Sequence, residues 1–333
     1  MSKRSLILIA AAISLLFVSV MWQFAEPKIY SWAERVAATI LGKPFNQTST
    51  QDPRGIPMQI YNTGETHYNP LFIAHDAQDA NVSRRMGAKP DRFILLSDWL
   101  LENIVEMDSI ALIQYDFDYP KYKQKAPWSS ALTQAVTMNA IAARAGMERN
   151  LQMLNLARKM LESLKPGAAG LSYALSDSVV WFMEYPAQTP YYALSGMLTT
   201  LLELYYYYDQ TRDPLAMELF NHGYNAVLQK LPEFDYHGYS YYDLNGSKAG
   251  RGYHQRHIKQ LGRLMEIRDH NVLRYYRNRW QHADSYPVLW QMLFNPRPKR
   301  IAAFTLSFLA LACLLYLLLA ATQKSGKIDP EHS

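Results

Sequence analysis

The stretch from residue 181 to residue 257 concentrates side chains that can stack on a sugar and transfer protons. It contains Glu184-Tyr185, the four tyrosines of residues 205–208, Tyr242-Asp243 and Tyr253 to His257. Tyrosine combines an apolar ring with a hydroxyl whose pKa lies near ~10, so it can pack against a sugar ring and can also exchange a proton. These residues predict a groove for a polar, ring-shaped substrate, with a plain aromatic core as the structural alternative.

Motifs for other common chemistries are absent from the sequence. It contains no C-x-x-C, H-E-x-x-H, P-loop or G-x-S-x-G pattern, which excludes the usual zinc, nucleotide and serine-hydrolase sites. His254 and His257 have a spacing that can ligate a metal on a helix, but no third ligand accompanies them at a suitable distance in the chain. We therefore expect neither a metal nor a cofactor.

Hydrophobic periodicity predicts a mainly α fold. Helices are expected over residues 91–104, 129–145, 150–164, 191–208 and 213–230, with a last pair between 254 and 280, and strands at 110–115 and 239–244. Residues 191–208 are apolar almost all round, as in a buried inner helix. Successive short-linked helices of this kind predict an (α/α) toroid-like domain with a few short β-hairpins and a groove at one end of its inner helices.

Two apolar segments, residues 5–22 and 301–322, bracket this domain. Each is long enough to cross a ~30 Å hydrocarbon layer. Lys3 and Arg4 predict a cytoplasmic N-terminus, and no small-x-small pattern follows the first segment, which favours an uncleaved anchor over a signal peptide.

We therefore expect a protein of the cytoplasmic (inner) membrane with two spans. The predicted divisions are cytoplasmic tails at 1–4 and 323–333, a linker or juxtamembrane helix at 23–56, a juxtamembrane linker at 286–300, and a domain at 57–285 on the periplasmic or extracellular side. The single cysteine, Cys313, lies in the second span, so the outward domain has no disulfide. The net charge of +5 comes without a basic stripe, and nucleic acid is not an expected partner.

Short motifs follow one another in a fixed order through the domain. They are Tyr68-Asn69-Pro70, Pro127-Trp128-Ser129-Ser130 with Gln134, Glu184-Tyr185-Pro186, Ser240-Tyr241-Tyr242-Asp243-Leu244 and Tyr253-His254-x-x-His257. In this order they resemble the C-terminal domain of the D-glucuronyl C5-epimerase family, in a membrane-anchored bacterial-type member. The chain departs from the family pattern at His75, at Ser195 and at Asn245, where animal members carry an arginine.

The resemblance implies C5-epimerisation of glucuronic acid residues in a polysaccharide. A base removes the C5 proton from one face of the ring, and an acid returns a proton to the other. Tyrosine suits such a role if a nearby cation lowers its pKa. The catalytic residues that the resemblance implies are Tyr242, Tyr253, Glu184 and Tyr185. The expected substrate-binding residues are His254, His257 and Arg256 for the carboxylate, Arg251 as a replacement for the arginine missing at Asn245, and Trp128, Gln134, Tyr68, Asn69 and Asp243.

Several of these residues could instead have a purely structural role. Tyr253 and His257 are about one helical turn apart and can simply pack on a neighbouring helix. Glu184 can cap the following helix, and Trp128 can pack rather than stack on sugar.

Three other functions fit the same residues. A uronate polysaccharide lyase begins with the same C5 deprotonation, and a glycoside hydrolase would need the carboxylate pair Glu184 and Asp243. A non-catalytic glycan-binding or assembly subunit of a polysaccharide export system is favoured by the departures from the family pattern. Expected partners are a uronic-acid-containing polysaccharide, the membrane, glycosyltransferase or export proteins, and a second copy of the chain in a homodimer.

Overall fold

A computed structural model describes residues 2–40, 49–61 and 64–325. The chain divides into two compact units, Gln47–Gln281 and a second unit formed by Met1–Asn46 with His282–Ser333. The first unit begins ahead of the predicted boundary at residue 57 because β1 (Ser49–Gln51) pairs with β2 (Pro57–Ile60). Each unit is described by itself.

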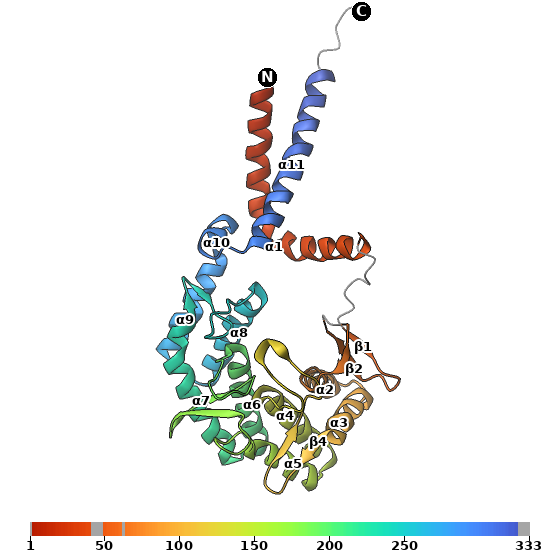
Figure 1. Ribbon diagram of the computed structural model, residues 1–333, viewed down its shortest axis with the longest axis vertical. Coiled ribbons are helices and arrows are strands. Elements are labelled where there is room, and N and C mark those ends of the chain that lie inside the picture. The colour runs from red at the N-terminus through yellow and green to blue at the C-terminus, as the bar shows by residue number, and fades with distance from the viewer. Residues whose placement is uncertain (1, 41–48, 62–63, 326–333) are drawn as a thin grey trace, which may run out of the picture. The chain divides into compact units, whose positions relative to one another are not determined.

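The larger unit is built from successive antiparallel helices (Figure 1). In chain order these are α2 (Pro70–Arg85), α3 (Asp91–Glu102), α4 (Ala131–Glu148), α5 (Leu151–Glu162), α6 (Leu194–Thr211), α7 (Pro214–Lys230), α8 (Arg251–Ile267) and α9 (Asn271–Ser285). Helices α2, α4, α6 and α8 pack side by side in that order, while α3, α5 and α7 each pack on the helix before them. This alternation of inner and outer helices confirms the predicted mainly α, toroid-like fold.

The sequence explains the helix starts and the close packing. Asn69 accepts hydrogen bonds from the backbone N–H groups of Leu71 and Phe72 and caps α2, and Ser130 caps α4 in the same way. Helix α4 is buried on nearly all sides because its alanines let α2, α5 and α6 approach closely.

Short antiparallel strands connect the helices. Strands β1, β2 and β3 (Thr66–Tyr68) form a three-stranded sheet. The two-stranded hairpins are β4 (Ile104–Glu106) with β5 (Ala111–Ile113), β6 (Ser172–Ser176) with β7 (Val179–Phe182), and β8 (Asp235–Tyr236) with β9 (Tyr239–Ser240). Two 3-10 turns, Pro120–Tyr122 and Leu231–Phe234, complete the unit.

Several predicted boundaries were wrong. The helix expected over residues 91–104 ends at Glu102, since Ile104 already pairs in β4. The strand expected at 239–244 stops at Ser240 because Asp243 Oδ1 accepts the N–H groups of Asn245 and Ser247 and turns the chain. Helix α2 and the three-stranded sheet were not predicted.

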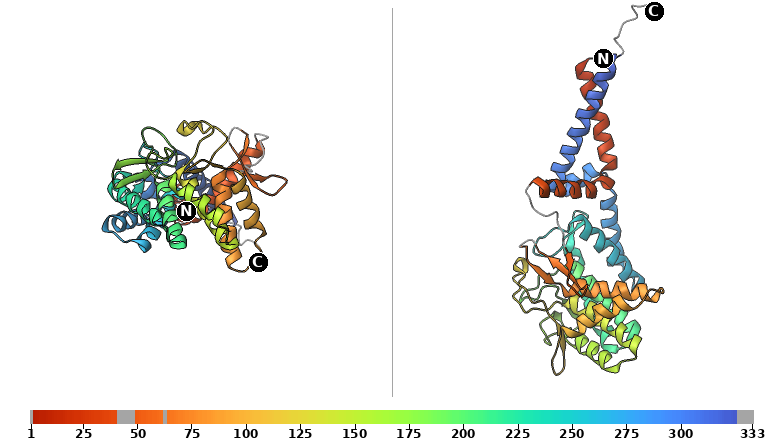
Figure 2. Two further views of the ribbon diagram at one scale, coloured as in Figure 1. Left: turned by 90° about the horizontal axis from the view of Figure 1, so that it is seen from below. Right: turned by 90° about the vertical axis from the view of Figure 1, so that its right-hand side faces the viewer.

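The smaller unit contains α1 (Lys3–Ile40), α10 (Val288–Phe294) and α11 (Pro298–Ser325). Helices α1 and α11 run side by side (Figure 2), with the rings of Trp22 and Phe304 5.1 Å apart. Arg300 Nε lies 3.1 Å from Glu26 Oε1 between the helices. Lys3–Trp22 and Pro298–Thr322 are long and apolar enough to cross a membrane, at the two predicted segments. Helix α1 continues to Ile40, within the segment 23–56 that we expected to be a linker or juxtamembrane helix.

Candidate functional site

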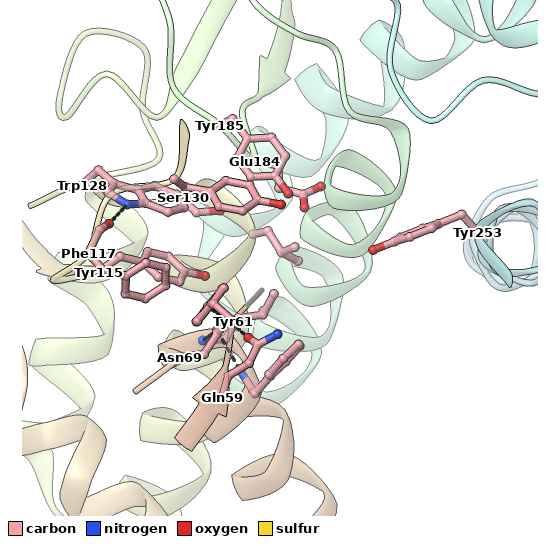
Figure 3. Close-up of a pocket in the computed structure, with 14 residues that line it drawn as sticks. Gln59, Tyr61, Asn69, Tyr115, Phe117, Trp128, Ser130, Glu184, Tyr185 and Tyr253 are labelled. Carbon is pink, nitrogen blue, oxygen red and sulfur yellow. Dashed lines mark hydrogen bonds between the residues drawn. The ribbon is translucent and has the colours of Figure 1, made fainter. Parts of the chain in front are cut away.

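A cavity of about 200 Å³ opens in the larger unit among three of the residues expected to be catalytic (Figure 3). Its lining comes from β2, the start of α2, the segment 115–132, the residues after β7 and the first turn of α8. The lining residues are Gln59, Tyr61, Asn69, Leu71, Phe72, Tyr115, Phe117, Tyr119, Trp128, Ser130, Leu132, Glu184, Tyr185 and Tyr253.

One wall of the cavity is a rigid aromatic stack. The rings of Trp128 and Tyr115 lie 4.0 Å apart and nearly parallel, and the two residues form an antiparallel bridge. Trp128 Nε1 donates a hydrogen bond to the carbonyl oxygen of Phe117 at 2.9 Å. Trp128 therefore both packs and presents its ring to the cavity, so a sugar can stack there.

Neutral polar groups form the opposite side (Figure 3). Asn69 Nδ2 donates to Gln59 Oε1 at 2.8 Å and to the Tyr61 hydroxyl at 3.1 Å, while its Oδ1 caps α2. Asn69 thus fixes the inner helix α2 and the neighbouring strand β2 around the cavity.

Glu184 supplies the carboxylate of the site. It follows β7 directly and lies against the first turn of α6, where a methyl group at position 196 would sit 2.7 Å from Glu184 Cβ. Only glycine at position 196 allows this approach. The Tyr242 hydroxyl donates a hydrogen bond to Glu184 Oε1 at 3.1 Å, and the Tyr185 hydroxyl lies 3.3 Å from that of Tyr242. Glu184, Tyr185 and Tyr242 therefore form one connected hydrogen-bonded group.

The protonation of this group follows from its surroundings. Burial raises the pKa of Glu184 above its usual range, although hydrogen bonds from Tyr185 and Tyr242 and the charge of Arg256 act in the opposite direction. Burial, followed by the negative charge of Glu184, raises the pKa of Tyr242 far above 10. The expectation of a tyrosine with a lowered pKa thus does not describe this site. Both tyrosines are neutral hydroxyls that can give protons, and Glu184 is the group able to accept one.

Tyr253 approaches from the other side of the cavity. It projects from the first turn of α8 with its hydroxyl directed inward (Figure 3), and 41% of the residue remains exposed. Its ring meets that of Tyr242 edge to face at 4.7 Å, and the guanidinium of Arg256 lies 5.2 Å from its ring centre. Burial and the charge of Glu184 raise the pKa of Tyr253 as well.

Comparison with known proteins places this site in a family. The family model for the D-glucuronyl C5-epimerase C-terminus matches residues 107–282, more than half of the chain. The chain belongs to this family. The cavity residues contributed by β2 and α2 precede residue 107, where the family match begins. This side of the cavity therefore comes from a part of the chain that the family model does not match.

Two individual similarities are weaker. An uncharacterized protein of Methanocaldococcus jannaschii is 29% identical over 174 residues, which is 50% of this chain and 56% of that protein. The chain thus spans about half the length of this curated relative. Among solved structures, a GH76 alpha-mannanase of Bacteroides thetaiotaomicron aligns with 82% of this chain and 71% of its own, at 11% identity and a TM-score of 0.44.

Other predicted site residues of this epimerase-family member lie outside the cavity. His254 Nδ1 accepts the N–H of Ser240, and His257 Nδ1 lies 2.8 Å from the Ser240 hydroxyl. Burial lowers the pKa of His257 to about 3, so it stays neutral. The two histidines hold β9 onto α8 and bring no cation to the cavity. No cluster of three or more His, Cys, Asp or Glu side chains that could hold a metal occurs in residues 2–40, 49–61 and 64–325.

The remaining candidates position the cavity walls. Gln134 is buried in α4 and bonds the backbone of Ile113 and Ala111 in β5. The Tyr68 hydroxyl donates to Asp52 at 2.8 Å. Asp243 Oδ2 accepts the Tyr122 hydroxyl at 3.0 Å, and Arg251 opens α8.

Several cavity residues were not singled out from the sequence. They are Gln59, Tyr61, Tyr115, Phe117 and Tyr119. They come from a short strand and from irregular segments, where no periodicity marks one side of the chain as functional.

Proposed function

We propose that the protein is a membrane-anchored enzyme that epimerises glucuronic acid residues at C5 in a polysaccharide. One observation carries the proposal: Glu184, which accepts a hydrogen bond from the Tyr242 hydroxyl, and Tyr253 line one cavity from different elements. C5-epimerisation requires a proton acceptor and a proton donor on opposite faces of a sugar ring. Membership of the D-glucuronyl C5-epimerase family supports the same reaction.

The reaction runs as a relay through the buried pair. The C5–H bond breaks and its proton passes to the Tyr242 oxygen while the Tyr242 proton passes to Glu184 Oε1. The electron pair left on C5 is delocalised into the substrate carboxylate as an enediolate. The Tyr253 O–H bond then breaks, and its proton goes to the opposite face of C5. Tyr253 is 41% exposed, so its phenolate regains a proton from solvent. Glu184 releases the proton that it took to solvent once the product leaves, which returns both groups to their starting state.

The proposal also includes an orientation of the chain in the membrane. The two apolar helices α1 and α11 would cross the cytoplasmic membrane and keep both tails inside, with the helical unit on the periplasmic or extracellular side. A tether at both ends holds the active site near the membrane, where glycosyltransferase or export proteins would deliver the growing chain.

The test is a product assay in ²H₂O with glucuronic-acid polymers, including a heparosan-type polymer and glucuronan. We expect deuterium at C5 and conversion of glucuronate to its C5 epimer, both measured by NMR. A product with an unsaturated uronate at a new chain end would instead identify a lyase, which expels the C4 oxygen after the same deprotonation. A folded protein that exchanges no C5 hydrogen in any uronate polymer would overturn the proposal.

A further inference from the structure

A second cavity, of about 260 Å³, lies beside the first and shares three lining residues with it. Tyr119, Tyr185 and Tyr253 line both cavities. The second is completed by Tyr242, Ser247 and Gly250 and by the lysines Lys121 and Lys248. The first cavity contains no basic residue among its lining side chains, whereas the second contains two. The two cavities therefore differ in charge on either side of the reacting tyrosines.

The two lysines are carried by segments that one side chain holds together. Lys121 lies in the turn Pro120–Tyr122, and the Tyr122 hydroxyl donates to Asp243 Oδ2 at 3.0 Å. Asp243 Oδ1 accepts the N–H of Ser247 at 3.1 Å, beside Lys248. Asp243 thus joins the two lysine-bearing turns and fixes their separation.

The lysine ammonium groups face rings rather than carboxylates. Lys121 Nζ lies 4.9 Å from the ring centre of Tyr122 and 5.4 Å from that of Tyr242, and Lys248 Nζ lies 3.7 Å from the ring centre of Tyr236. Within the described part of the chain, neither ammonium lies within 4.0 Å of an Asp or Glu oxygen. Lys125, on the same loop as Lys121, is by contrast paired with Asp118. Both cavity lysines are thus available to an anion.

The residues that the sequence predicted to bind the substrate carboxylate do not line the second cavity. His254 and His257 are buried against Ser240, and neither Asn245 nor Arg251 lines the second cavity. The Arg256 guanidinium lies 5.2 Å from the ring centre of Tyr253, and Arg256 lines neither cavity. The cations that line the second cavity together with Tyr242 are Lys121 and Lys248.

We propose that Lys121 and Lys248 form the binding site for the carboxylate of the reacting uronate. This inference rests on the proposed function, because a carboxylate attached to C5 must lie next to the groups that exchange the C5 proton. Negative charge grows on this carboxylate as the enediolate forms, so two ammonium groups stabilise the transition state more than the ground state. Their flexible stems allow both to turn from the aromatic rings toward one carboxylate.

The test compares binding of two sugars by the full-length protein in detergent. The probes are a heparosan-type tetrasaccharide and the same tetrasaccharide with its carboxylates reduced to alcohols. The wild-type protein should bind the charged sugar about 10-fold more tightly. The Lys121→Gln/Lys248→Gln double variant should bind both sugars equally, and Lys121→Arg/Lys248→Arg should keep the preference. Lys123→Gln is the matched control, since Lys123 is exposed on the same turn and does not line the cavity.

C5 exchange, measured on the same proteins, separates the two proposals. The double glutamine variant should exchange about 10²-fold more slowly than wild type. Wild-type exchange that persists in that variant would overturn the lysine site and leave the epimerase proposal standing. Lysine-dependent preference for the charged sugar without exchange would support the anion site and sink the epimerase. A double variant that keeps the preference would overturn the inference.

Discussion

At the scale of single residues, the site depends on a carboxylate whose proton affinity is raised by its surroundings. Tyr242 and Tyr253 remain protonated because burial and the charge of Glu184 raise the pKa of both. Neither is a free phenolate base, so in the proposed reaction Tyr242 accepts the C5 proton only while Glu184 takes its own. The proposal therefore makes Glu184 the group that sets the pH dependence of exchange.

This assignment predicts an activity profile with one limb. Glu184 must be ionised to act, and its pKa is raised, so the C5 exchange rate should fall with decreasing pH at values above the ordinary glutamate pKa of 4.5. Tyr253 must be protonated, and because its pKa is raised above 10, no alkaline limb should appear below pH 10. The check is kcat/KM for exchange between pH 4 and pH 10. A rate that stays constant down to pH 4.5 would contradict the role of Glu184.

The structure brings together the four residues that the sequence motifs predicted to be catalytic. Glu184, Tyr185, Tyr242 and Tyr253 meet although they lie on three separate segments, and only their motifs linked them beforehand. His254 and His257 share those motifs, yet they pack on Ser240. A motif does not distinguish a residue that touches substrate from one that holds the backbone behind it.

At the scale of elements, the first turn of α6 positions Glu184. Gly196 lacks the Cβ that would collide with Glu184, while Gly146 in α4 has nothing within 4 Å of such an atom. Gly196→Ala should lower the free energy of unfolding by about 1–3 kcal/mol and reduce exchange. Gly146→Ala should stabilise the protein by about 0.5–1 kcal/mol and leave exchange unchanged. Thermal unfolding and exchange rates of the two variants check this, and equal behaviour of both would refute the packing argument.

The inner helices meet at a buried carboxylate. Glu203 of α6 accepts hydrogen bonds from Gln78 of α2 and Asn139 of α4, and burial raises its pKa to about 7. Because the folded-state pKa exceeds the unfolded value, this residue contributes stability below pH 4.5, and that contribution is lost as pH rises through 7.

Replacing this carboxyl should remove its pH dependence. Between pH 5 and pH 8, wild type should lose up to about 3 kcal/mol of unfolding free energy more than Glu203→Gln. Chemical unfolding at the two pH values measures the difference. The same loss in both proteins would show that Glu203 does not titrate in this range.

Sequence periodicity predicted most helices but missed α2. Only Pro70, Ile73, Ala74 and Ala77 of that helix are buried, so its apolar side is short and made largely of small residues. For the same reason the neutral polar side of the cavity was not predicted as a unit, because β2 and the start of α2 supply it. Long-range packing rather than local hydrophobicity decides these elements.

In the whole molecule, the chain carries an apolar helix on each side of the helical unit, α1 before it and α11 after it. Arg300 and Glu26 form a nearly buried ion pair where α1 and α11 pack. The predicted topology can be tested because Cys313 is the single cysteine. In a Cys313→Ala background, a membrane-impermeant maleimide applied to intact cells with a permeable outer barrier should label Lys89→Cys and not Ser2→Cys. The reverse labelling would place the helical unit in the cytoplasm.

In the proposed reaction, the Tyr242–Glu184 pair exchanges the C5 proton of a uronate. The most direct measurement is the rate of deuterium incorporation at C5 for wild type, Tyr242→Phe and the exposed control Tyr275→Phe, with sugar affinity determined in parallel. We predict that Tyr242→Phe lowers the rate at least ~10²-fold with unchanged affinity, while Tyr275→Phe behaves like wild type. Exchange by Tyr242→Phe at the wild-type rate would rule out the proposed proton transfer through Tyr242, and binding without exchange by the wild type would identify a non-catalytic glycan-binding subunit.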